Sequence, residues 1–162
     1  MPGTYEPLAT VTASGVSTFI VMSSIPSTYT DLVLVGIFPK VGAGSTRLTV
    51  NNDTSSLYSQ VVLYGNPSTA ASGTERNQSR FYLMDYLSAS TSQPNMSITH
   101  LMNYSNTTTF KSFLERSGVQ GSGNSLNVGL YRSKNAINRI DISDGSNFSA
   151  GTRFTLYGIK AA

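Results

Sequence analysis

Apolar and polar residues alternate with a period of two along most of this chain, and no other feature limits its fold as strongly. Residues 16–23, 57–64 and 152–159 alternate in this way, and turn-forming pairs such as Asp144-Gly145 separate the segments. Such alternation is typical of β-strands with one buried face, and no segment beyond about eleven residues carries the apolar stripe of an amphipathic helix. The pattern predicts an all-β fold, namely an antiparallel, jelly-roll-like β-sandwich of about eight strands.

Two pairs of neighbouring segments are predicted to form β-hairpins. The first pairs residues 47–51 with residues 57–64 across a turn rich in Asn and Asp. The second pairs residues 96–102 with residues 108–116. Residues 67–79 favour at most one helical turn, because a glycine interrupts them.

The composition fits one domain with a surface of unusually low charge. The chain has 162 residues, of which 39% are hydrophobic, so it can form one packed core. We expect an N-terminal arm in residues 1–14 and a single β-sandwich domain in residues 15–162. Only 12% of the residues are charged, against about 25% in a typical soluble domain. This composition excludes a coiled coil or a charged helical bundle.

Charge, hydropathy and cysteine content exclude several classes of function. The net charge of +3 comes from eleven basic and eight acidic residues that are scattered along the chain, so nucleic acid is not a predicted partner. The apolar runs are too short for a transmembrane span, so a membrane is not a predicted partner either. The absence of cysteine excludes disulfides, thiolate catalysis and cysteine-ligated zinc.

The sequence contains no group of residues that predicts catalysis. His100 is the only histidine, and its phase with Met96 and Ile98 on a predicted strand favours a core or interface histidine. A glycoside hydrolase needs two paired carboxylates, but nothing singles out two of the eight acidic residues. Metal-ligand spacings are also absent from the sequence. We therefore predict a protein that is not an enzyme and has no catalytic residues, no metal site and no cofactor.

Two segments carry distinctive residue strings rather than a generic strand pattern. They are residues 23–35, which begin Ser23-Ser24-Ile25-Pro26, and residues 151–160. Together with residues 4–10, 51–65 and 111–118, they resemble a family of small virion structural proteins of tailed bacteriophages. The resemblance implies a component of the phage particle with a β-sandwich body, and relatives range from capsid decoration proteins to tail fibres. It implies no catalytic residue.

We expect a capsid decoration (cement) protein that binds the outer surface of a tailed-phage head and stabilises the shell. Its partners are then the major capsid protein and copies of itself in a homotrimer, on the capsid exterior after assembly in the host cytoplasm. The alternative is a tail-fibre or receptor-binding tip module that recognises a host surface glycan through loops at residues 88–95 and 117–124. The candidate partner contacts are Tyr5, Glu6, Pro7, Tyr131 and Arg132.

Overall fold

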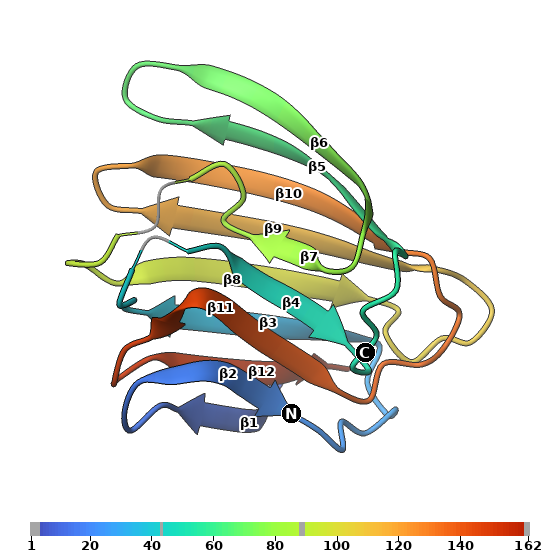
Figure 1. Ribbon diagram of the computed structural model, residues 1–162. Coiled ribbons are helices and arrows are strands. Elements are labelled where there is room, and N and C mark those ends of the chain that lie inside the picture. The colour runs from blue at the N-terminus through green and yellow to red at the C-terminus, as the bar shows by residue number, and fades with distance from the viewer. Residues whose placement is uncertain (1–3, 43, 88–89, 161–162) are drawn as a thin grey trace.

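The computed structural model describes residues 4–42, 44–87 and 90–160 (Figure 1). These residues form twelve β-strands and no helix, so the predicted all-β class is confirmed and none of them belongs to a membrane-spanning helix. The predicted number of about eight strands is too low. The strands are β1 (Tyr5–Thr12), β2 (Ser17–Met22), β3 (Asp31–Phe38), β4 (Thr46–Val50), β5 (Tyr58–Gly65), β6 (Ala70–Gln78), β7 (Phe81–Leu83), β8 (Asn95–Met102), β9 (Lys111–Val119), β10 (Gly123–Tyr131), β11 (Ile140–Phe148) and β12 (Arg153–Ile159).

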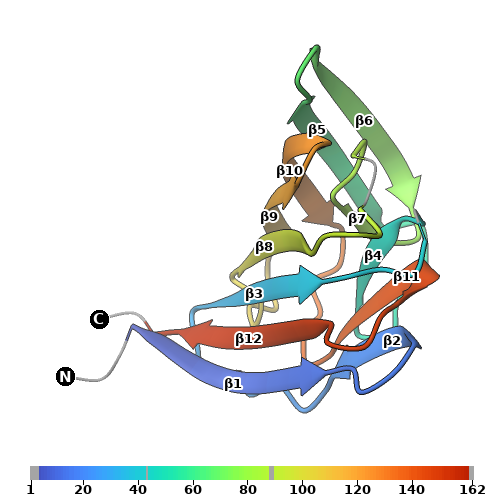
Figure 2. The ribbon, with the colours of Figure 1, turned by 90° about the vertical axis from the view of Figure 1, so that its left-hand side faces the viewer.

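The strands form two antiparallel sheets that lie against each other. The large sheet has eight strands in the order β1-β12-β3-β8-β9-β10-β5-β6, and the small sheet has four in the order β2-β11-β4-β7. Figure 2 shows the small sheet beside the lower strands of the large sheet, with β5 and β6 rising beyond it. We call β1, β12, β3 and β8 the covered half of the large sheet, and β9, β10, β5 and β6 its extension, where β7 of the small sheet reaches the inner side and its Phe81 contacts Phe113 of β9 edge-on.

One hydrophobic core lies between the two sheets. Phe38 of β3 stacks on Phe154 of β12 with ring centroids 5.1 Å apart, and Phe148 of β11 contacts both rings edge-on. Gly36 of β3 makes room for this cluster, because a Cβ atom there would lie 2.3 Å from the Phe154 ring. Large aromatic rings of this kind account for much of the apolar surface that a small domain buries.

One of the two predicted hairpins forms and the other does not. β8 and β9 pair as predicted, from Met96 opposite Gly118 to Met102 opposite Ser112. The segments of the other predicted hairpin become β4 and β5, which lie in different sheets, so that prediction is wrong. Between these strands Asn51 adopts a left-handed backbone with a φ of 55°, as its neighbour Asn52 does, and the chain crosses from the small sheet to the large one.

The two edges of the large sheet come from segments for which no strand was predicted. β1 pairs with β12 from Tyr5 opposite Ile159 to Thr12 opposite Arg153. The segment predicted as an arm, residues 1–14, thus contains an edge strand of the sandwich, while residues 1–3 lie outside the described residues. β6 forms the other edge, so the helical turn favoured in that segment is wrong.

Candidate functional site

The middle of β10, in the extension of the large sheet, reverses the usual relation between polarity and burial, although Phe113 of β9 and Val62 of β5 are buried nearby. In β10, Ser125 and Asn127 are buried, whereas Leu126, Val128 and Leu130 are exposed. Sheets that face water on one side normally place apolar residues inward and polar residues outward. β10 therefore presents to the outside apolar side chains that a strand usually buries.

The exposed side chains of neighbouring strands form one continuous surface. Val61 of β5 lies opposite Val128 of β10, which lies opposite Leu114 of β9, and residues that lie directly opposite share a face. Leu63 and Leu126 form a second row beside them. We call this surface the outer apolar face; it consists of Val61, Leu63, Met96, Ile98, Leu114, Leu126, Val128 and Leu130.

Two shallow hollows lie on the outer apolar face. The larger, of about 530 Å³, has Val61, Val128 and Leu130 in its lining together with the basic side chains of Arg76 and Arg132. The smaller, of about 250 Å³, lies over β3, β8 and β9, and its lining includes the aromatic ring of Tyr5. The larger hollow combines its apolar side chains with a polar and charged border, and such open hollows of mixed chemistry suit a protein surface.

The inner face of the extension carries a buried polar cluster around Glu115 of β9. Its carboxylate accepts hydrogen bonds from the Ser97 hydroxyl at 2.8 Å, the Asn127 amide at 2.6 Å and the Met84 backbone N–H at 3.4 Å. Burial raises the pKa of Glu115 to about 7, although these hydrogen bonds lower it. Because the carboxyl is fully buried, the cluster is part of the packing between the layers and offers no accessible acid or base.

A second acidic group lies beside this cluster. Asp85 accepts a hydrogen bond from the Gln60 side chain at 2.8 Å. Burial, and then the charge of Glu75, raise the pKa of Asp85 to about 6. Within the described ranges, no three His, Asp or Glu residues come together in an arrangement that could hold a metal ion.

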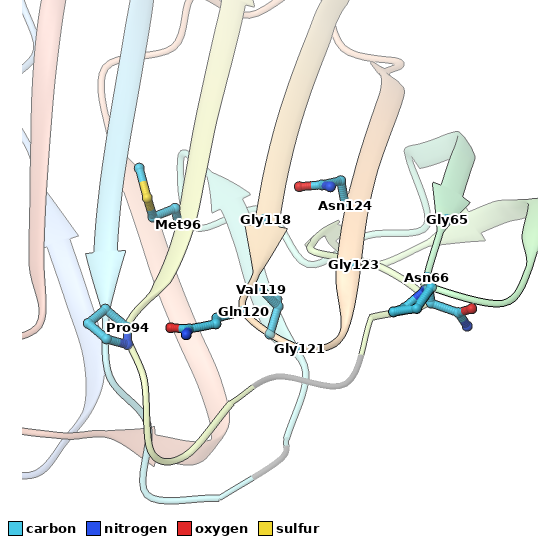
Figure 3. Close-up of a pocket in the computed structure, with 11 residues that line it drawn as sticks. Gly65, Asn66, Pro94, Met96, Gly118, Val119, Gln120, Gly121, Gly123 and Asn124 are labelled. Atoms are coloured by element: carbon cyan, nitrogen blue, oxygen red, sulfur yellow. The ribbon is translucent and has the colours of Figure 1, made fainter.

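A hollow of about 820 Å³ lies at the turn between β9 and β10 (Figure 3). Asn66, Gln120 and Asn124 bring amide side chains to its lining, and Figure 3 places Pro94 and Asn66 on opposite sides. Gly123 is required here, because its φ is +146° and a Cβ would lie 2.0 Å from a backbone oxygen. The described lining residues include no charged side chain and no aromatic ring, so they offer amide hydrogen bonds and the apolar side chains of Met96, Val119 and two prolines.

The outer face of the small sheet has a different chemistry. Phe19 of β2, which is 60% exposed, lies opposite Ser143 of β11, which lies opposite Arg47 of β4. A hollow of about 760 Å³ covers this area and also borders Arg80 and Arg139. We call this surface the basic outer face; it consists of Phe19, Val21, Arg47, Arg80, Arg139 and Asp141.

The charges of the basic outer face do not cancel. Arg139 and Asp141 form an ion pair at 2.6 Å, which leaves the guanidinium groups of Arg47 and Arg80 in excess. An excess of arginine around exposed apolar side chains favours a partner surface that carries carboxylates.

Three of the five predicted contact residues lie together at the β1 edge. The Tyr5 ring is exposed and packs edge-on against Tyr157, with ring centroids 6.4 Å apart, and Pro7 lies opposite the same tyrosine. Glu6 forms an ion pair with Lys160 at 2.8 Å, and the hydrogen bond from Lys160 lowers the pKa of Glu6. This edge thus offers an aromatic ring and a neutralised ion pair to a partner.

The other two predicted contact residues lie far from this edge and are held by the protein itself. Tyr131 is buried, stacks on Tyr58 with centroids 4.8 Å apart and donates a hydrogen bond to Asp53 at 2.6 Å. Arg132 donates to the Ser56 carbonyl at 2.7 Å and is bound to further side chains. Four strands, β12, β3, β8 and β9, separate β1 from β10, so the structure does not bring the two groups together.

His100 lies on the outer side of β8, in line with the outer apolar face. It is opposite Leu114, and its Nε2 lies 3.1 Å from Asp31 Oδ2. Asp31 also accepts a hydrogen bond from the Asn103 backbone N–H at 2.7 Å. The sequence left open whether His100 is a core or an interface histidine. In the structure it is partly buried and lies on the outer side of the large sheet.

Comparisons with known proteins do not extend this description. No protein-family model matches the chain, and no curated protein matches it. The candidate sites therefore rest on the geometry of the chain itself.

Sequence reasoning missed both outer faces. The alternation in residues 126–130 predicts a strand correctly, but it carries no information on which side another layer covers. Arg47, Arg80 and Arg139 are far apart in the sequence and meet because β4 pairs with both β11 and β7. Only the burial pattern across several strands reveals these surfaces.

Proposed function

We propose that this chain is a structural virion protein, namely a capsid decoration (cement) protein that binds the outer surface of a tailed-phage head and stabilises the shell. It acts as a homotrimer on the capsid exterior and is assembled in the host cytoplasm. The observation that carries the proposal is the presence of two unlike outer faces, one apolar and one basic, on the two sheets of one sandwich. Two such surfaces suit a protein that must bind both its own copies and a different partner.

The sandwich is a jelly roll in this proposal. Four nested strand pairs support that assignment, which are β1 with β12, β2 with β11, β3 with β8 and β4 with β7. The hairpins β5-β6 and β9-β10 are then additions that lengthen one sheet beyond the eight strands of the jelly roll. Jelly rolls are common in viral capsid proteins, but a fold alone does not determine a function.

We assign the basic outer face to contact with the major capsid protein. Its excess of arginine complements a shell surface that carries carboxylates, and Phe19 adds an exposed apolar anchor. Tyr5 and Pro7 lie on the edge strand β1, and Tyr5 lines a hollow on the outer side of the large sheet, so the partner contact that we assign to them is separate from the basic outer face. Each contact is shallow, and several copies in one oligomer strengthen the whole through avidity.

Heads purified without this protein provide the test. Added back, the purified protein should bind them and raise the temperature at which they release DNA. A Phe19→Asp and Arg80→Glu double variant should weaken binding to heads by about tenfold or more. Arg153→Glu repeats the Arg80→Glu charge reversal on the large sheet; it is the control for that substitution and should bind normally. Heads that lack the protein and are as heat-stable as complete ones would contradict the function.

The alternative is a tail-fibre or receptor-binding tip module that recognises a host surface glycan. The hollow in Figure 3 supports this alternative, because the amides of Gln120 and Asn124 can hydrogen-bond to sugar hydroxyls. Residues 88–89 of the proposed glycan-binding loop lie outside the described residues. Under this alternative the purified protein should block phage adsorption, and each particle should contain few copies rather than many.

A further inference from the structure

We propose that the outer apolar face is the surface through which copies of this chain associate. The occupant of the face is therefore a second copy of the same chain, packed sheet against sheet. The inference deepens the proposed function, on which it rests for the number of copies, three.

The first argument is the reversed burial around β10. Asn127 and Glu115 are fully buried on the inner side, while Val128 and Leu63 are exposed on the outer side. Water has access to the apolar side only while the chain is alone. Association through this face removes the reversal, because both sides of β9, β10 and β5 are then buried.

The second argument is the size of the face. Six of its side chains, Val61, Leu63, Met96, Leu126, Val128 and Leu130, are each 36–56% exposed. These fractions correspond to roughly 500 Å² of apolar side-chain surface, where a stable interface buries about 800 Å² per partner with a polar rim. The face is thus large enough to form the dry centre of such an interface.

The third argument is charge, which distinguishes a second copy from other occupants. Arg116 of β9 lies among the apolar residues of the face, and Glu75, Arg76 and Arg132 line its larger hollow, so charges of both signs border the apolar rows. Two basic outer faces cannot meet in this way, because they would bring Arg47 and Arg80 of both copies together. The outer apolar face is therefore the sheet face of this chain that tolerates contact with itself.

The geometry of the face suits copies around a threefold axis. The rows Leu63-Leu126 and Val61-Val128 run across the strands, so they can interdigitate with equivalent rows of another sheet. Around such an axis the contacts are heterologous, so one part of the face on each copy contacts one neighbour and a different part contacts the other.

The molar mass of the purified full-length protein in sedimentation equilibrium tests the inference. The wild type should be an oligomer, and Val128→Asp should be a monomer, because it places a charge in the centre of the contact. Phe19→Asp is the matched control; it changes an equally exposed apolar residue on the other sheet and should leave the mass unchanged. The milder double variant Val61→Thr and Val128→Thr retains the shape of both side chains and should weaken association about tenfold to a hundredfold.

Three results would overturn the inference. They are a monomeric wild type at the concentrations used for binding to heads, an oligomer of unchanged stability in both outer-face variants, or a monomeric Phe19→Asp. A monomeric wild type that still binds heads would overturn the inference and leave the proposed function intact. If the outer-face variants dissociate as expected but the wild-type oligomer binds no heads, the inference stands and the proposed function is wrong.

Discussion

In the covered half of the large sheet, Leu34 and Leu156 lie opposite each other and point into the core. In the extension, Leu63 and Leu126 also lie opposite each other, but they point away from the core. The backbone pairing is antiparallel in both places. The difference lies in what covers the apolar side, because the small sheet covers it in one half and no part of the described chain covers it in the other.

This comparison separates two questions that strand patterns usually answer together. Alternation identifies the side of a strand that is to be buried, and it does not identify what buries it. In the covered half the second layer comes from the same chain. In the extension the second layer comes, in our proposal, from another copy.

The largest expected effect comes from shortening one leucine in each half. In a monomeric Val128→Asp background, Leu34→Ala should lower the free energy of unfolding by about 3–5 kcal/mol, because it leaves a cavity in the core. Leu63→Ala should cost less than about 1 kcal/mol there, because its side chain already contacts water. Urea unfolding at equal protein concentration measures both. Equal losses would mean that Leu63 is buried within a single chain and would remove the distinction between the two halves.

The sequence predicts those parts of the fold that depend on local pattern. The all-β class and the pairing of β8 with β9 follow from alternation and one short connection. The placement of β4 and β5 in different sheets does not, because both segments alternate equally well and the separation depends on contacts with β11 and β10. β6 is built from small and polar residues such as Gly73, and it forms a strand only because β5 pairs with it.

The candidate sites were less predictable than the fold. Tyr131 stands next to Arg132 and Lys134, and this neighbourhood suggests a surface position. The structure buries its ring against Tyr58, a contact between residues that are far apart in the sequence. Tyr5 and Glu6 reach the surface because β1 is an edge strand.

The second expected effect compares the two buried carboxylates. Asp144 forms an ion pair with Lys40 at 2.7 Å, with both side chains fully buried, whereas Glu115 has only neutral hydrogen-bond donors. Asp144→Asn should lower the free energy of unfolding by about 3 kcal/mol, because it leaves the Lys40 charge buried without a partner. Adding Lys40→Met should recover most of that loss. Asp141→Asn, whose partner Arg139 is partly exposed, is the control and should cost less than about 1 kcal/mol. An equal loss of stability in Asp144→Asn and Asp141→Asn would contradict the importance of the buried ion pair between Asp144 and Lys40.

The smallest expected effect concerns the pH dependence that Glu115 imposes on the extension. Its pKa rises from an ordinary 4.5 to about 7 in the folded chain, so the folded state holds this proton more tightly than the unfolded state. The stability that Glu115 contributes is complete below its ordinary pKa and falls as the pH rises to about 7, by up to about 3 kcal/mol. Glu115→Gln cannot ionise, so it should match the wild type near pH 5 and be more stable by about 2 kcal/mol near pH 8.

Glu6 provides the matched control for this prediction. The hydrogen bond from Lys160 lowers the pKa of Glu6, so its contribution is present above its ordinary pKa and is lost as the pH falls. Glu6→Gln should therefore leave the decline between about pH 5 and pH 8 unchanged. Urea midpoints measured across this range distinguish the two variants. Parallel curves for the wild type and Glu115→Gln would mean that water reaches the Glu115 carboxylate in the folded chain. The inner side of the extension would then be open to water. The outer apolar face would no longer be favoured over the inner side as the surface that an assembly buries.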